Sequence, residues 1–85
     1  MIEKVTIVDV RTPQEFDGGN VDGSINIPLD QIVARLGEIR AMAKPLIHCC
    51  ASGGRSGQAA EYLNQNGIEC KNGGGWMQVN AEFRS

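Results

Sequence analysis

The sequence predicts an α/β fold in which a small central parallel sheet is flanked by helices on both faces. β-branched apolar runs alternate with segments of helical periodicity along the whole chain, which is the pattern of βαβ units. The length of 85 residues allows one domain, residues 1–85, with a modest core. An apolar fraction of 41% and a charged fraction of 21% are ordinary for a globular protein.

The chain opens with a strand and a capped helix. Residues 5–10 are β-branched and almost continuously apolar, as expected of a buried parallel strand. Thr12 and Glu15 then have the spacing of a capping box, with Pro13 at the first helical position. We expect the short helix that they begin to stop near Gly18.

The middle of the chain predicts a second strand, a longer helix and a third strand. Residues 23–28 indicate a brief strand that ends at a proline. From residue 29 to residue 43, isoleucine and leucine recur at helical spacing, which predicts one helix over this stretch. Another proline precedes a strand that runs from residue 46 to residue 49 or 50.

The last part of the chain predicts one more helix and one more strand. Residues 56–66 are helical in composition, and Gly67 stands where glycine commonly ends a helix. Residues 68–70 indicate a last short strand, and three glycines separate it from a final segment that begins at Trp76. Ligand sites in parallel sheets lie at the carboxyl ends of strands, so the end of the third strand is the expected site.

That strand end combines two cysteines, a loop of small residues and an arginine. Glycines let such a loop curl so that its N–H groups surround a sulfur, and the helix dipole adds positive potential. A guanidinium beside it can bind an oxyanion through two hydrogen bonds. We therefore predict a reactive thiolate and a small anionic substrate. The loop that follows the cysteines consists of Ala51, Ser52, Gly53, Gly54, Arg55 and Ser56.

Composition argues against several other kinds of site and partner. The formal net charge is −2 and no basic block occurs, so nucleic acid is not an expected partner. No apolar run approaches the roughly 18 residues of a membrane span, and the N-terminus lacks a signal-peptide layout. We expect a cytoplasmic protein, although a trimmed periplasmic protein would look the same. The three cysteines favour reduced thiols, and their spacing does not fit a zinc site.

Four segments resemble the rhodanese-type sulfurtransferases, in the order of that family and over nearly the whole chain. Residues 50–56 resemble the C-x-x-G-x-R-S active-site loop. Residues 8–16 are similar to the D-V-R-x-x-x-E-[FY] segment of the family, and residues 19–28 are similar to its G-H-[IV]-x-G-A-x-N-[IV]-P segment. Residues 74–76, Gly-Gly-Trp, fit as well. The compact length looks most like the small phage-shock-type single-domain rhodaneses.

The resemblance implies a function and a role for each residue of the loop. Cys50 would be the nucleophile that takes the sulfane sulfur of thiosulfate, releases sulfite and becomes a persulfide. A thiol, cyanide or a cysteine of another protein would then accept the sulfur. The N–H groups of the loop would stabilise the persulfide, and Arg55 would hold thiosulfate and the departing sulfite. No cofactor is required.

Two other interpretations remain open at this point. Counting from Cys49 gives five residues before Arg55, which is the H-C-x5-R-[ST] pattern of cysteine phosphatases of the Cdc25 type. We favour Cys50 because it places Gly53 on the loop glycine of the rhodanese family, and because no aspartate is evident as a phosphatase general acid. A non-catalytic rhodanese-like binding module is the third interpretation. Under the favoured one, Cys49 faces away from the loop and His48 is hydrogen-bonded locally.

Overall fold

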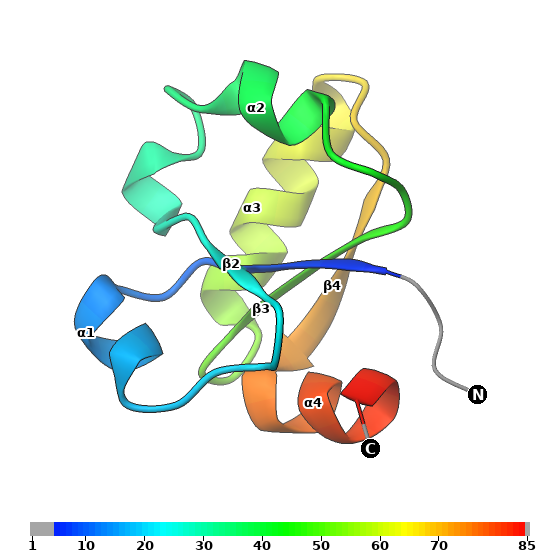
Figure 1. Ribbon diagram of the computed structural model, residues 1–85. Helices are drawn as coiled ribbons and strands as arrows, with labels where there is room; N and C mark the ends of the chain where they lie inside the picture. The colour runs from blue at the N-terminus through cyan, green and yellow to red at the C-terminus, as the bar shows by residue number, and fades with distance from the viewer. Residues whose placement is uncertain (1–4, 85) are drawn as a thin grey trace.

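The computed structural model describes residues 5–84, and its centre is a four-stranded parallel sheet (Figure 1). The order across the sheet is β2-β1-β3-β4, and each pairing is parallel. β3 pairs with β1 on one side and with β4 on the other, so its carboxyl end lies between two neighbouring strands. The strands are β1 (Thr6–Asp9), β2 (Ile25–Asn26), β3 (Leu46–Cys50) and β4 (Cys70–Gly75).

Helices cover both faces of this sheet, which confirms the predicted fold class (Figure 1). Apolar residues of α2 and α3 pack on one face, and apolar residues of α4 pack on the other. No helix within residues 5–84 is long and apolar enough to cross a membrane. The helices are α1 (Pro13–Asp17), α2 (Leu36–Arg40), α3 (Gly54–Gln65) and α4 (Trp76–Arg84), with a 3-10 helix, η1, at Leu29–Gln31.

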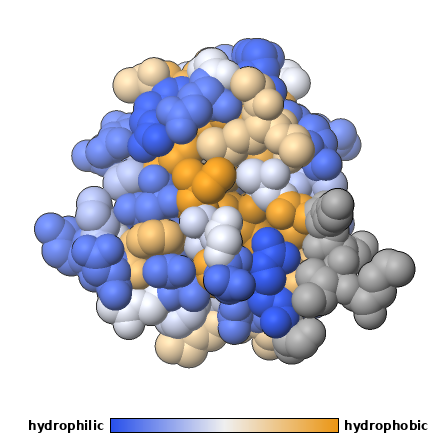
Figure 2. Space-filling model, in the orientation of Figure 1, coloured by the Kyte–Doolittle hydropathy of each residue, from blue (hydrophilic) through white to orange (hydrophobic). Residues whose placement is uncertain are grey.

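The alternation of side chains along β1 and β3 divides the core into two clusters. Val8 and Cys50 belong to the cluster beneath α2 and α3, whereas Ile7 and Cys49 belong to the cluster that contains Val79 of α4. The two adjacent cysteines therefore point to opposite faces of the sheet. Figure 2 shows apolar side chains between polar ones on the face seen in Figure 1, where β2 crosses in front of β1.

The capping box predicted for the first helix is present. The backbone N–H of Glu15 donates to Thr12 Oγ1 at 3.2 Å, and Glu15 Oε1 accepts from the backbone N–H of Thr12 at 3.0 Å. The helix ends at Gly18, as expected. Glu15 is thus held in place by its own helix, and this matters for the site described below.

The single helix expected over residues 29–43 is wrong. The chain forms η1, a turn and then the five-residue helix α2. The backbone N–H of Leu29 donates to the carbonyl of Val10 at 3.0 Å, so the end of β1 fixes the direction of η1. Gly37 lowers the helix propensity of this segment by about 1 kcal/mol relative to alanine, which leaves tertiary contacts to decide where the helix forms.

The last strand and the helix before it also differ from expectation. α3 begins at Gly54 rather than at Ser56. Strand β4 runs over Cys70–Gly75, so the glycines expected to separate it from the final segment lie inside it. A Cβ at Gly73 would lie 2.7 Å from side-chain carbons of both Ile47 and Val79. Glycine is needed there because α4 packs closely over β4, a contact that strand propensity does not reveal.

Candidate active site

The loop between β3 and α3 is wound around the sulfur of Cys50. Gly53 has a φ of 107°, a left-handed conformation that favours glycine, and its N–H points at Cys50 Sγ with an N···S distance of 2.9 Å. A Cβ at Gly53 would also lie 3.3 Å from the Cα of Gly74 in β4. The buried hydroxyl of Ser56, in the first turn of α3, lies 3.4 Å from the same sulfur. The sulfur therefore sits at the N-terminus of a twelve-residue helix.

These contacts favour the thiolate form of Cys50. Burial acts to raise the pKa of the thiol, but hydrogen bonds from the Ser56 hydroxyl and from three backbone N–H groups outweigh it and lower the pKa to about 7. About half of the Cys50 side chains are therefore ionised near neutral pH. The three N–H groups belong to Ser52, Gly53 and Ser56.

Cys49 has the opposite environment. Burial, followed by the nearby charge of Asp9, raises the pKa of its thiol to about 12. The residue is completely buried in the cluster under α4, on the face of the sheet away from the loop. Cys49 is therefore a neutral thiol at physiological pH, and the loop surrounds only Cys50. This geometry favours the interpretation that counts from Cys50.

Arg55 is engaged in an ion pair that the sequence did not predict. Its Nη1 donates to Glu15 Oε1 at 2.7 Å and its Nη2 donates to Glu15 Oε2 at 3.0 Å. The hydrogen bonds from Arg55, and then the backbone N–H of Thr12, lower the pKa of the Glu15 carboxyl to about 2. Both side chains remain about one-third exposed, at 36% and 37%. The guanidinium that was expected to bind an anionic substrate is therefore paired with a carboxylate.

A cavity of about 320 Å³ opens beside Arg55 at the carboxyl ends of β1 and β2. Its walls combine apolar surface with the Arg55 guanidinium and one exposed carboxylate, that of Asp30. This is the end of a parallel sheet at which ligands commonly bind. The residues that line it are Val10, Thr12, Pro28, Leu29, Asp30 and Arg55.

Asn72 of β4 contacts the loop, although no pattern in the sequence predicts this contact. Its Nδ2 donates to the carbonyl of Gly53 at 3.0 Å, and its Oδ1 accepts from the Ser56 hydroxyl at 2.6 Å and from the N–H of Gly74 at 3.0 Å. The amide thus ties the last strand to the loop and to the first turn of α3. The sequence signal that could have indicated this contact is an amide side chain on β4, the strand that pairs with β3 and its terminal cysteine.

A buried ion pair supports the site from the end of β1. Arg11 donates to both carboxylate oxygens of Asp9, at 2.7 to 3.0 Å, and its Nη2 also donates to the carbonyl of Gly19 at 2.7 Å. The guanidinium carbon lies 4.9 Å from the ring centroid of Trp76. Because its donors are used within the fold, Arg11 braces the connection after β1.

His48 differs from expectation. It is completely buried in β3, yet neither ring nitrogen has a hydrogen-bond partner among the described residues. The local hydrogen bond expected for it is therefore wrong. Burial lowers the pKa of its imidazole to about 4, so the ring is neutral near pH 7.

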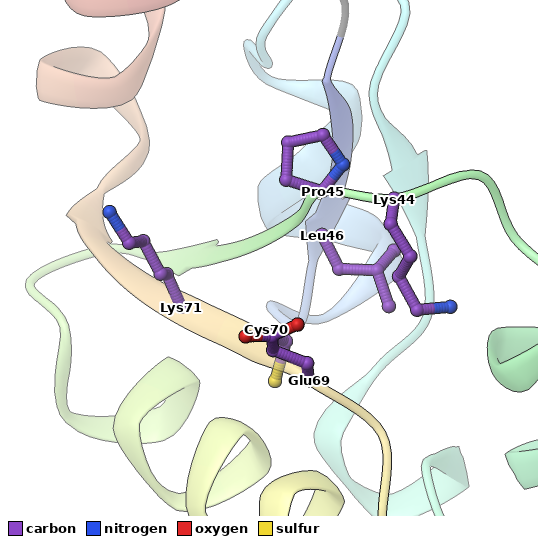
Figure 3. A pocket seen from close by; sticks show the side chains of 6 residues that line it. All are labelled: Lys44, Pro45, Leu46, Glu69, Cys70 and Lys71. Carbon is purple, nitrogen blue, oxygen red and sulfur yellow. The ribbon is translucent and has the colours of Figure 1, made fainter.

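A second cavity, of about 360 Å³, lies at the opposite end of the sheet from Cys50 (Figure 3). It contains the third cysteine, Cys70, whose Sγ lies 3.7 Å from the carbonyl of Ala60 and whose pKa is raised by burial. The ammonium groups of Lys44 and Lys71 point away from Cys70 on opposite sides (Figure 3). The polar groups that line this cavity do not converge on a common point. The lining residues are Lys44, Pro45, Leu46, Glu69, Cys70 and Lys71.

Comparison with known proteins identifies the family. Residues 1–82 match the family described as "Rhodanese-like domain". The chain belongs to the rhodanese-like family. This rhodanese-like domain is 47% identical over 64 residues to the uncharacterised protein YqhL of Bacillus subtilis, a match that covers 75% of this chain and 50% of YqhL. It therefore spans only about half the length of that relative.

Other proteins that are similar to the rhodanese-like domain are named sulfurtransferases. It is 32% identical over 84 residues to the thiosulfate sulfurtransferase GlpE of Shewanella oneidensis, covering 93% of this chain and 82% of GlpE. The solved structure of a "rhodanese with anions" from Escherichia coli superposes with a TM-score of 0.79 at 31% identity, covering 88% of this chain and 91% of the other. The predicted family is thereby confirmed.

Proposed function

We propose that this rhodanese-like domain transfers the sulfane sulfur of thiosulfate to a thiophilic acceptor through a persulfide on Cys50. The observation that supports it most directly is the environment of the Cys50 sulfur, which accepts the Gly53 N–H at 2.9 Å and lies 3.4 Å from the Ser56 hydroxyl. Similarity to thiosulfate sulfurtransferases supports the same chemistry. The adjacent Cys49 has neither the loop nor a lowered pKa.

In the first step, the Cys50 thiolate attacks the outer sulfur of thiosulfate. A new S–S bond forms on Cys50, the S–S bond of thiosulfate breaks, and sulfite leaves with the bonding electron pair. The product is a persulfide anion, so total charge is conserved. The N–H groups of the loop, which already face the sulfur, are placed to stabilise negative charge on the persulfide.

In the second step, an acceptor removes the outer sulfur of the persulfide. Cyanide or a thiolate attacks that sulfur, the persulfide S–S bond breaks, and its electron pair returns to Cys50 as thiolate. The products are thiocyanate or a new persulfide on the acceptor, which includes the case of a cysteine on another protein. Ala51 and Ser52, the loop residues next to Cys50, are exposed, so an acceptor would approach from the loop side.

Thiocyanate formation from thiosulfate and cyanide tests this function. We expect activity in the parent chain and in Cys49→Ser, and none in Cys50→Ser. The two variants are a matched pair because each replaces one sulfur atom by oxygen, at neighbouring positions whose side chains lie on opposite faces of the sheet. Loss of activity in Cys49→Ser together with full activity in Cys50→Ser would overturn the assignment. Hydrolysis of para-nitrophenyl phosphate that depends on Cys49 would instead establish a phosphatase.

A further inference from the structure

The ion pair between Glu15 and Arg55 has a consequence for the charge of the substrate, given the sulfur transfer proposed above. An anionic donor would bind the same guanidinium that the Glu15 carboxylate already occupies through Nη1 and Nη2 of Arg55. Arg11, the other arginine at this end of the sheet, is paired with Asp9. Both guanidinium groups beside the site are therefore neutralised by a carboxylate before a substrate arrives.

Glu15 is unusually well placed to keep Arg55 occupied. Its Oε1 accepts from the backbone N–H of Thr12 at 3.0 Å and from the Thr12 hydroxyl at 3.2 Å, while also accepting from Arg55. The capping box thus fixes the carboxylate, and the carboxylate fixes the guanidinium. Arg55 lines the 320 Å³ cavity beside the loop, so its charge acts on whatever enters there.

We propose that Glu15 is a specificity-determining residue that competes with the donor for Arg55 and makes the site discriminate against doubly charged sulfur donors. A donor that bears two negative charges must displace the Glu15 carboxylate or bind beside it, and either costs free energy. A donor with one negative charge is penalised less, because its repulsion by the carboxylate is smaller. The inference rests on the proposed function but concerns only the affinity of the site for anions.

The substitution Glu15→Gln separates charge from structure. Glutamine also serves as the third residue of a capping box, so the start of α1 is kept while the negative charge is removed. Glu38→Gln is the matched control. It removes the same charge from a similar two-bond pair with Arg35, at 2.9 Å for each bond, on α2.

Two donors of the same chemistry but different charge measure the effect. Thiosulfate carries two negative charges, and methanethiosulfonate carries one; its outer sulfur is transferred in the same way and methanesulfinate leaves with the electron pair. We expect Glu15→Gln to raise kcat/KM about fivefold for thiosulfate and only about twofold for methanethiosulfonate, as for removal of one exposed negative charge nearby. Glu38→Gln should change neither value. A ratio between the two donors that stays constant or falls in Glu15→Gln would overturn the inference.

A binding measurement keeps this test independent of turnover. Sulfate, a dianion without a transferable sulfur, should protect Cys50 from alkylation by iodoacetamide. We expect the sulfate concentration that halves the alkylation rate of Cys50 to be about one-fifth as high in Glu15→Gln as in the parent chain. Equal protection of the two proteins would contradict the role of Glu15. If neither donor were turned over while the sulfate shift was observed, the proposed function would fail and the inference about Glu15 would stand.

Discussion

At the scale of single residues, two adjacent cysteines show how position sets reactivity. Cys49 and Cys50 have the same side chain, and both are almost completely shielded from solvent. Only the side chain of Cys50 lies on the face of the sheet where the loop after β3 directs its N–H groups at the sulfur. Hydrogen bonds from the loop lower the pKa of Cys50 to about 7, whereas burial and the charge of Asp9 raise the pKa of Cys49 to about 12.

The hydroxyl of Ser56 is expected to contribute to this difference. The single hydroxyl proton of Ser56 is shared between Asn72 Oδ1 at 2.6 Å and the Cys50 sulfur at 3.4 Å, so replacing Ser56 by alanine should raise the pKa of Cys50 by less than the loss of a full hydrogen bond would. The measurement is the rate of alkylation by iodoacetamide against pH, with a midpoint at about pH 7 in the parent chain. Ser24→Ala is the control, because that hydroxyl donates to the carbonyl of Val21. An unchanged midpoint in Ser56→Ala would contradict this role.

At the scale of elements, the site depends on how β4 lies against the loop and α3. Asn72 bonds to Gly53 and Ser56, so β4 takes part in shaping the sulfur pocket although it carries no reacting group. The close approach is possible because this strand is rich in glycine. A Cβ at Gly75 would lie 2.9 Å from the carbonyl oxygen of Ala51, within the loop itself.

Asn72→Ala should therefore impair the site more than the fold. We expect kcat/KM for thiosulfate to fall about tenfold, because the loop and the Ser56 hydroxyl lose their anchor. Asn64→Ala is the matched control, since Asn64 also joins α3 to β4, through two hydrogen bonds to the backbone of Cys70. That variant should lose stability while kcat/KM is retained. Equal kinetic effects of the two substitutions would count against a specific role for Asn72.

Two glycine substitutions test the packing of the elements. Gly73→Ala should lower the free energy of unfolding by about 1 to 3 kcal/mol, because the added methyl group overlaps Ile47 and Val79. Gly37→Ala in α2 meets no atom within 4 Å and should raise it by about 0.5 to 1 kcal/mol. Urea unfolding measures both changes. If Gly73→Ala proved as stable as the parent chain, α4 could not pack on β4 as described.

At the scale of the whole molecule, stability should depend on the protonation of one buried histidine. The imidazole of His48 titrates at about 4 in the folded chain, against an ordinary value of 6.5. The unfolded chain therefore binds the additional proton between these values. The free energy of unfolding is highest above pH 6.5 and falls by about 3 kcal/mol as the pH is lowered to 4.

Urea unfolding across this pH range checks the prediction. His48→Leu should remove that part of the pH dependence, because the chain contains no other histidine. Carboxylates also titrate toward the acid end of the range, so the comparison is between the slopes of the two proteins rather than their absolute stabilities. Parallel slopes from pH 6.5 to 4 would show that His48 accepts its proton in the folded state.

The sequence predicted the parts of this molecule that depend on neighbours along the chain. The capping box, the β-branched strands and the loop after Cys50 are local patterns, and each is present. The ion pair of Arg55 joins residues 40 positions apart, and Asn72 meets Ser56 across 16 positions. No periodicity or motif encodes such contacts. They arise only when parallel strands bring the ends of separate segments to one edge of the sheet.

Intact-mass measurement shows which cysteine carries the transferred sulfur. The chain is incubated with thiosulfate without an acceptor, and the mass of each intact variant is measured before and after addition of cyanide. We expect the parent chain and Cys49→Ser to gain the mass of one sulfur atom and to lose it to cyanide as thiocyanate, and Cys50→Ser to gain none. A sulfur retained by Cys50→Ser, or absent from Cys49→Ser, would contradict this expectation.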